Sequence, residues 1–277
     1  MPKVLCFINQ KWFQILTIGA ALFFAAEQAL KFTNNINFVP TVILLGAFLV
    51  PAAFVAYFYS QEQVLDKSSH LEIPLSLVAI CFLAGGVVGS IVAGFFEYTT
   101  LSSSSVSTLF SAALIEEAAK LIFPIVIFMR GRYRSEADGL FFGVTCGMGF
   151  AALETMGYGL TTLLQTQGNV GALQEILLIR GLLSPVGHAA WTGLVCAVLW
   201  RQREKTHKSF NAWVVGAFAL AVIFHTVWDI AGTSKQLFVT YLGFIAVGIV
   251  SLTLLILRLR DARKTTKARQ LQTPSQS

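Results

Sequence analysis

The sequence predicts an all-α protein, a polytopic membrane helical bundle of about eight transmembrane helices with the N-terminus and the C-terminus in the cytoplasm. Three observations lead to this prediction: the scarcity of charge, the length of the apolar stretches and the distribution of Lys and Arg. Of 277 residues, 55% are hydrophobic and 12% are charged, whereas soluble domains carry about 25% charged residues. So few charges cannot cover the surface of a water-soluble globule of this size.

Eight apolar stretches are long enough to cross a membrane. A hydrocarbon core about 30 Å thick requires roughly 20 apolar residues in a helix that rises about 1.5 Å per residue. The stretches lie at residues 12–30, 39–59, 75–96, 106–129, 138–162, 182–200, 211–230 and 236–258. They leave no room for a soluble domain, so residues 1–277 are predicted to form a single membrane domain. Residues 260–277 are expected to be a basic, disordered cytoplasmic tail.

The basic residues predict the orientation. Sixteen of the 20 Lys and Arg residues lie at one set of span ends, Lys31, Arg180 and Lys235 lie at the opposite set, and Lys120 lies inside a span. The excess of basic residues marks the cytoplasmic side. The net charge of +6 therefore reports topology, and no nucleic-acid partner is expected. The first stretch also fits a signal peptide, whose cleavage would remove one span without reversing the others.

Ionisable side chains inside the predicted spans are the candidate functional groups, because burying a charge in a bilayer is costly. They gather in the spans at 106–129, 138–162, 182–200 and 211–230. The seven residues are Glu116, Glu117, Lys120, Glu154, His188, His225 and Asp229. At about 1.5 Å per residue, Glu116, Glu154, His188, His225 and Asp229 all lie in the outer half of their spans. This shared depth predicts one site on the extracytoplasmic side.

Helical spacing predicts contacts within two of these spans. Lys120 follows Glu117 by three positions and Glu116 by four, so its ammonium group can reach either carboxylate. His225 and Asp229 are also four positions apart, and a carboxylate in this position can fix the tautomer of the ring.

The span at 106–129 is expected to be distorted and the site to be unbalanced in charge. Pro124 has no N–H group, so it leaves the carbonyl of Lys120 without its helical partner. The site sets four carboxylates against the single ammonium of Lys120. Because like charges in a low dielectric cannot all ionise, a shared proton, a protonated histidine or a bound cation is required.

At these residues the sequence resembles the PrsW family of intramembrane proteases, which belongs to a superfamily with CAAX-prenyl endopeptidases and bacteriocin-immunity proteins. The family pattern is E-E-x-x-K, then F-x-x-x-E, then two helices with histidine, the last as H-x-x-x-D. The matching residues are Glu116, Glu117 and Lys120; Phe150 and Glu154; His188; and His225 and Asp229. The resemblance covers about residues 105–232, the predicted catalytic core. Prenyl endopeptidases carry Arg and His at the positions of Lys120 and Glu154, which argues against isoprenylated substrates.

The resemblance implies an intramembrane endopeptidase, a multi-pass protein of the bacterial plasma (inner) membrane. Its substrate would be a membrane-anchored protein, such as an anti-sigma factor, cut on the extracytoplasmic side in a site-one step of regulated proteolysis. Glu116 would act as the base that activates a water molecule. Glu154 would hold the other side of that water, so that the two carboxyl groups share a proton.

The resemblance also implies roles for the remaining site residues. Glu117 and Lys120 would position the base and balance its charge. His188 and His225 would stabilise the tetrahedral oxyanion or protonate the leaving amine, and Asp229 would orient His225.

Two catalytic types remain open at this point. The glutamic type without a cofactor is favoured. The alternative is a zinc hydrolase in which Glu154, His188 and His225 bind Zn²⁺ and Glu116 is the base.

Two other classes of function are also compatible with the residues. A proton-coupled transporter would line a bundle with similar groups, but it usually shows an inverted repeat with polar groups in both halves. A non-catalytic scaffold or immunity protein would keep the motifs for packing. The expected partners are the lipid bilayer and the substrate, and the oligomeric state is left open.

The stretch at 161–180 is predicted to lie outside the membrane between two spans. Its second half can form a short amphipathic helix at the interface. This segment is either a gate for the substrate or a simple connector.

Overall fold

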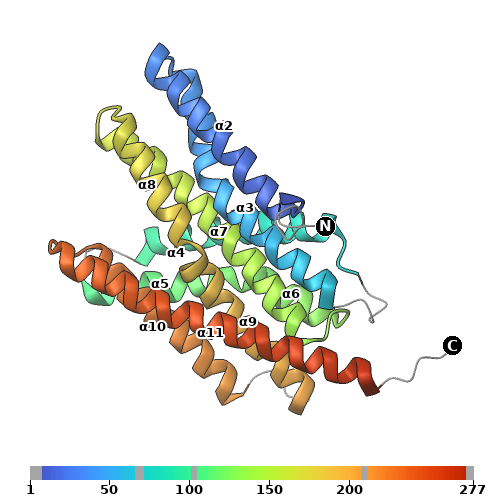
Figure 1. Ribbon diagram of the computed structural model, residues 1–277. Coiled ribbons are helices and arrows are strands. Elements are labelled where there is room, and N and C mark those ends of the chain that lie inside the picture. Colours follow the sequence, from blue (N-terminus) through green and yellow to red (C-terminus); the bar gives the residue numbers. More distant parts are fainter. Residues whose placement is uncertain (1–7, 66–71, 101–104, 207–210, 273–277) are drawn as a thin grey trace.

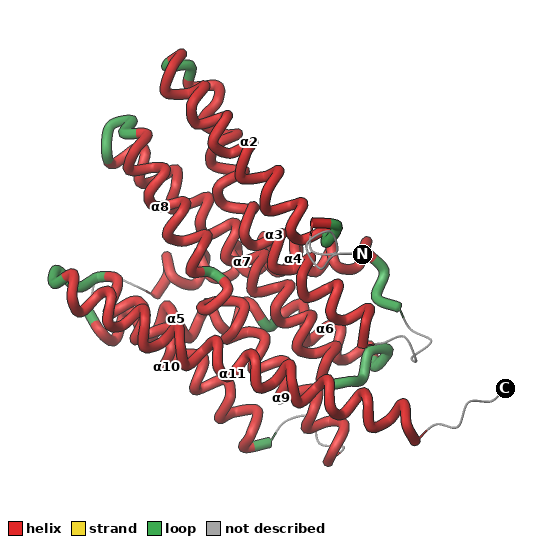
Figure 2. Tube along the Cα trace, viewed as in Figure 1, coloured by secondary structure: helices red, strands yellow, loops and turns green. Residues whose placement is uncertain are grey.

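The computed structural model describes residues 8–65, 72–100, 105–206 and 211–272, and this part of the chain contains helices and no strands. The predicted all-α fold is therefore confirmed. In chain order the elements are α2 (Lys11–Thr33), the 3₁₀ turn η1 (Ile36–Phe38), α3 (Val39–Leu65), α4 (Leu75–Thr100), α5 (Val106–Lys120), α6 (Ile122–Arg130), α7 (Glu136–Gln165), α8 (Val170–Leu183), the π-helical turn η2 (Pro185–Ala189), α9 (Ala190–Thr206), α10 (Ala212–Gly232) and α11 (Leu237–Gln272). Figures 1 and 2 show them as one bundle of long helices.

Seven helical segments of the described chain are long and apolar enough to cross a membrane, one fewer than the eight predicted. The missing one is the stretch at 106–129, which is broken at Leu121 into α5 and α6. The distortion expected from Pro124 lies at this point, because Pro124 has no N–H group to bond to the carbonyl of Lys120. Next to that carbonyl, the amide of Leu121 bonds in a tighter turn to the carbonyl of Ala118 at 3.2 Å. The break directly follows Lys120, at the end of α5.

Helix α7 forms the centre of the bundle and lies against α3, α4, α8 and α9 (Figure 1). Its residues from Glu136 to Ala152 are all buried. Glycines permit close approach on two sides: a Cβ atom added at Gly143 would lie 2.6 Å from the carbonyl oxygen of Thr192 in α9, and one at Gly85 in α4 would lie 2.6 Å from Cα of Cys146. Small residues at these contacts let helix backbones pack tightly in a membrane.

The stretch at 161–180 differs from the prediction of a short helix at the interface. Helix α7 continues to Gln165, the chain reverses, and α8 packs back along the bundle. Leu173 and Leu177 of α8 are fully buried in an apolar cluster with Ile43 of α3. Because α8 continues through η2 into α9, residues 170–206 form one bent helical segment that replaces the shorter span predicted at 182–200.

The C-terminal region is more ordered than predicted. Helix α11 runs without interruption to Gln272, so residues 260–272 are helical rather than disordered. Residues 273–277 of the predicted tail lie outside the described residues. Near this end Arg258 and Asp261 of α11 form ion pairs with each other and with Glu136 and Arg201, which ties α11 to α7 and α9.

Candidate active site

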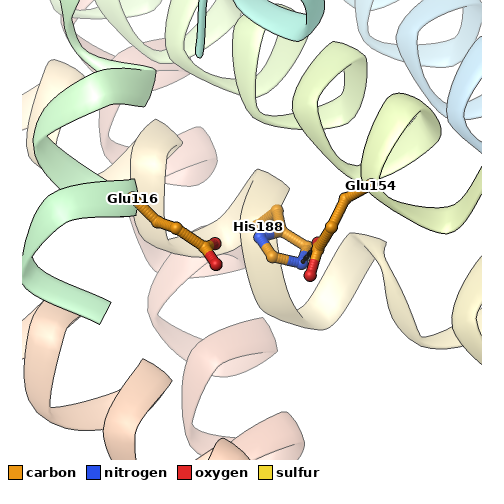
Figure 3. Close-up of side chains that lie close together, drawn as sticks. All are labelled: Glu116, Glu154 and His188. Atoms are coloured by element: carbon orange, nitrogen blue, oxygen red, sulfur yellow. Dashed lines mark ion pairs between the residues drawn. The ribbon is translucent and has the colours of Figure 1, made fainter. Parts of the chain in front are cut away.

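Four elements of the bundle bring the seven predicted site residues to one region. Helix α5 carries Glu116, Glu117 and Lys120 in its last turn; the others come from α7, η2 and α10. Figure 3 shows the carboxylates of Glu116 and Glu154 directed toward one another, with the ring of His188 between them. These three residues lie on three different elements, so their convergence is a property of the fold and not of local sequence.

Glu154 is held from both sides by one bent helical segment. Nη2 of Arg180, in α8, lies 2.7 Å from Oε1 of Glu154, and Nε2 of His188, in η2, lies 3.0 Å from Oε2. The guanidinium group of Arg180 also stacks 3.8 Å above the ring of Tyr158, one turn after Glu154. Each carboxylate oxygen of Glu154 therefore faces a different partner.

The π-helical turn is what presents His188 to Glu154. Pro185 opens the turn, and the amide of Ala189 bonds to the carbonyl of Ser184, five residues earlier, at 3.4 Å. Such turns inside helices occur frequently at functional sites. Gly147 of α7 faces the turn, since a Cβ atom there would lie 3.0 Å from the carbonyl carbon of His188.

A second group of ionisable residues lies behind the first and is almost completely buried. Nζ of Lys120 donates to Oε1 of Glu117 at 2.7 Å and to Oε2 of Glu116 at 3.2 Å, which confirms both contacts predicted from helical spacing. The same ammonium group lies 4.3 Å above the ring of Phe150. Glu117 and Lys120 are 1% and 0% exposed. Lys120 therefore connects the solvent-inaccessible carboxylate of Glu117 with the carboxylate of Glu116, which faces the site.

His225 is oriented mainly by Glu117. Its Nδ1 lies 2.9 Å from Oε1 of Glu117, whereas Nε2 lies 3.6 Å from carboxylate oxygens of both Glu116 and Asp229. The predicted neighbour Asp229 is therefore present but more distant than Glu117. A hydrogen bond on one ring nitrogen sets the role of the other, so Glu117 directs Nε2 of His225 toward Glu116.

A cavity of about 480 Å³ opens beside this cluster. Glu116, Glu154, His188 and Asp229 line it, and so does Arg180. One of its walls is aromatic, formed by Trp191, Trp228 and Phe244, with the last two rings stacked 4.3 Å apart. A cavity with an apolar wall and a few converging polar groups is the usual form of a substrate site.

Three residues of the site were not found from the sequence. Arg180 was counted only as one of three basic residues at the outer span ends. The small number of basic residues on that side was the one signal in the sequence that could have pointed to Arg180. Glu97 and Tyr158 line the cavity as well, but nothing in their sequence positions indicated it. With Arg180 and Glu97 included, the site holds five carboxylates and two cations among the described residues, not four and one.

Comparison with known protein families shows the family to which the chain belongs. The sequence model of the PrsW family, described as intramembrane metalloproteases, matches residues 73–256, which is 184 of the 277 residues. The chain belongs to the PrsW family. It is thus an intramembrane protease of the multi-pass type, as the resemblance implied. Searches of curated proteins and of solved structures gave no significant match.

The PrsW match extends beyond the motifs. It begins before α4 and ends within α11, whereas the motifs alone indicated about residues 105–232. Both added helices contribute to the site: α4 carries Glu97, and α11 carries Thr240 and Phe244 of the cavity wall.

The description of the PrsW family as metalloproteases raises the question of whether these residues fit a metal ion. Among the described residues, Glu116, Glu154 and His188 each offer a ligand atom, and the three atoms lie within 4.8 Å of one another. Oε2 of Glu154 is buried and forms no well-directed hydrogen bond, although Nε2 of His188 lies 3.0 Å away. Two carboxylate oxygens and one imidazole nitrogen form a donor set suited to catalytic zinc, so the residues fit. The ligand set predicted from the sequence was Glu154, His188 and His225. In the structure, Glu116 takes the place of His225 in this set.

Proposed function

We propose that this protein hydrolyses a peptide bond of a membrane-anchored protein, with a water molecule activated by glutamate. One observation carries the proposal: Glu116, Glu154 and His188 converge from three elements, with their polar atoms within 4.8 Å, at the edge of a 480 Å³ cavity. A water molecule placed between two carboxylates has a base on one side and a second acceptor on the other, which is the arrangement that general-base hydrolysis requires.

The surrounding residues assign separate tasks to the two glutamates. Glu116 accepts the proton of the water, and Lys120, 3.2 Å away, stabilises its negative charge. Glu154, fixed by Arg180 and His188, orients the water. Nε2 of His225 lies 3.6 Å from Glu116, so it is placed to receive that proton and pass it to the leaving amine. Glu117 and Lys120 are positioning residues because neither lines the cavity.

A divalent metal such as zinc, if present, would be held by Glu116, Glu154 and His188. When bound, it would supply Lewis-acid activation of water and of the carbonyl group. Lys120 and Arg180 already pair with the two carboxylates, which supports the glutamic form without a metal; the family description supports the zinc form. We favour the glutamic form and treat the zinc form as the competing candidate.

The substrate side follows from the distribution of basic residues. Sixteen of the 20 Lys and Arg residues lie at the predicted span ends opposite the site, so the positive-inside rule supports a site in the extracytoplasmic half of a bacterial plasma membrane. A membrane-anchored regulator, such as an anti-sigma factor, presents a peptide bond near that face. We therefore propose a site-one cleavage.

The test uses purified full-length protein and a reporter with a single-span anchor. Glu116→Gln, Glu154→Gln and His188→Ala are expected to lower kcat/KM by about 10²–10⁴-fold, the contribution of positioned acid–base groups. Glu175→Gln is the matched control because Glu175 is an exposed glutamate of α8 outside the cavity. Wild-type protein that cleaves no anchored reporter, or three site variants that cleave as well as Glu175→Gln, would refute the protease function in favour of a scaffold.

Metal analysis of the same preparation separates the two catalytic types. We expect no stoichiometric metal and no inhibition by chelators. Stoichiometric zinc that is lost in His188→Ala and kept in His225→Ala would instead establish the zinc form with Glu116, Glu154 and His188 as ligands. Zinc lost in His225→Ala would favour the ligand set of Glu154, His188 and His225.

A further inference from the structure

Helices α4 and α7 are in close contact along one half of their length and separate along the other. In the close half, an added Cβ atom at Gly86 would lie 2.7 Å from the carbonyl oxygen of Gly149, and one at Gly89 would lie 2.8 Å from the ring of Phe150. Further along the same helices, an added Cβ atom at Gly94 or at Gly157 would meet no atom within 4 Å. The two helices therefore form a wedge that opens toward the end where the site lies.

The open part of the wedge is a groove of about 380 Å³. Its walls are Ser90, Ala93 and Gly94 of α4, and Gly157 and Thr161 of α7. Its floor consists of residues of the site, since Glu97, Glu116, Glu154 and Tyr158 line both this groove and the 480 Å³ cavity. The two spaces meet at the pair of glutamates assigned to water activation.

The groove lies beside an apolar surface that we assign to the bilayer. Large apolar side chains with high exposure flank it on both helices: Ile91 and Phe95 of α4 are 66% and 63% exposed, and Leu160 and Leu164 of α7 are 50% and 69% exposed. In a membrane helix such side chains contact lipid. A substrate can therefore reach the groove sideways, from within the membrane.

Two polar atoms in the groove have no partner within the described chain. Oγ of Ser90 and Oε1 of Glu97 are buried and form no hydrogen bond. A peptide must be extended at the bond to be cut, and its backbone N–H and C=O groups then lack helical partners, which is costly in hydrocarbon. Ser90 and Glu97 are suited to accept or donate hydrogen bonds to such a backbone.

We propose that the α4–α7 groove is the lateral path by which the substrate enters, and that it binds the extended segment of the substrate next to its membrane anchor. This proposal rests on the proposed function. It specifies the substrate class further: a chain held in the bilayer by a helix whose outer end can unwind. The peptide passes between Gly94 and Gly157, with its backbone paired to Ser90 and Glu97, and continues past the two glutamates into the aromatic-walled cavity.

The first test fills the groove. Gly94→Phe and Gly157→Phe each add a ring where the chain offers open space, and Gly216→Phe in α10 is the matched control because an added Cβ atom at Gly216 also meets nothing within 4 Å. Each variant is assayed on an anchored reporter and on a short soluble peptide with the same cleavage sequence. The preference for the anchored reporter is expected to fall about tenfold or more in kcat/KM for the two groove variants and to stay unchanged for Gly216→Phe.

One outcome of this assay would overturn the proposal of entry between α4 and α7. An unchanged preference in Gly94→Phe and Gly157→Phe, whether both activities persist or both fall together, would show that the substrate does not enter between α4 and α7. Hydrolysis of the soluble peptide by the wild type would leave the proposed function standing in that case, so the two failures are distinguishable.

The second test does not depend on turnover. An anchored reporter with a photoreactive residue beside the cleavage position is bound to the Glu116→Gln variant, irradiated, and the attachment sites are mapped by mass spectrometry. Adducts on the groove walls at residues 90–97 and 157–161 are expected. Adducts confined to α10 and α11 would overturn the proposal.

Discussion

Helix α7 carries Glu136 in its first turn and Glu154 in its second half, and the two lie in clusters of opposite character. Glu136 belongs to what we term the arginine cluster, made of Glu136, Arg201, Arg258 and Asp261. Glu154 belongs to the site, 18 residues or about 27 Å away along the helix. The arginine cluster pairs two acids with two bases across α7, α9 and α11. The site holds five carboxylates and two cations among the described residues.

The difference distinguishes ion pairs that we interpret as structural from those that we propose to be functional. In the arginine cluster every charge has an opposite charge within 4 Å, and Arg201, Arg258 and Asp261 are between 24% and 42% exposed. In the site the excess carboxylates lie beside two cavities, and Oε1 of Glu97 is buried without a hydrogen bond. Buried carboxylates in excess must share protons or bind a cation. The feature that distinguishes the site is therefore an excess of carboxylates over cations next to a cavity, and not merely the presence of charged residues in the membrane.

Removing the buried cation of the site is expected to have the largest effect. Lys120→Met leaves Glu117, which is fully buried, and Glu116 without their common partner. Breaking a buried ion pair on one side costs about 3–5 kcal/mol, so the variant should melt far below the wild type in detergent. Lys120→Met combined with Glu117→Gln removes one charge of each sign and should recover part of that loss. A melting temperature of Lys120→Met equal to that of the wild type would show that the site is not held together by its charges.

The loss of Arg180 is expected to affect activity more than stability. Arg180 and Glu154 are 21% and 18% exposed, so water can partly replace the ion pair, but the position of Oε1 would no longer be fixed. Loss of a partner that orients a site ligand costs about 10–100-fold in activity. We therefore expect Arg180→Met to lower kcat by this factor with little change in KM on the anchored reporter.

A double-mutant cycle tests whether Arg180 acts through Glu154. If it does, Arg180→Met should add little to the defect of Glu154→Gln, because residues that form one unit are non-additive. Fully additive losses would contradict the positioning role. Arg180→Lys keeps the charge but not the planar group that stacks on Tyr158, and it should restore activity only in part.

Contacts within one helix could be predicted from the sequence, and contacts between helices could not. Spacings of three and four residues located the pairs that Lys120 forms with Glu116 and Glu117, and both are present. The pair of His225 with Glu117 joins residues 108 positions apart. Its formation depends on how α5 and α10 are rotated toward each other, which no spacing along the chain encodes. The shared depth of the site residues did limit which pairs can form.

The errors in the fold have the same origin. Hydropathy measures whether a stretch is apolar enough to lie in the membrane, not whether its helix is continuous. It therefore located residues 106–129, and only Pro124 indicated the distortion that divides them into α5 and α6. Helix α8 was assigned to a connection because its apolar residues were counted apart from those of α9. Arg180 was thereby placed outside the membrane, although the bend at η2 brings it to Glu154.

The smallest effect is expected in the arginine cluster. Arg258→Gln removes one of two bases, but Arg201 remains within 3.7 Å of both Glu136 and Asp261. Partly exposed ion pairs contribute about 0–1 kcal/mol, so the melting temperature should fall slightly and kcat/KM on the anchored reporter should not change. The cluster lies about 27 Å from Glu154 and shares no residue with either cavity. A loss of activity larger than that of Arg180→Met would mean that the arginine cluster holds the site residues in place from a distance, and the distinction between the two ends of α7 would no longer hold.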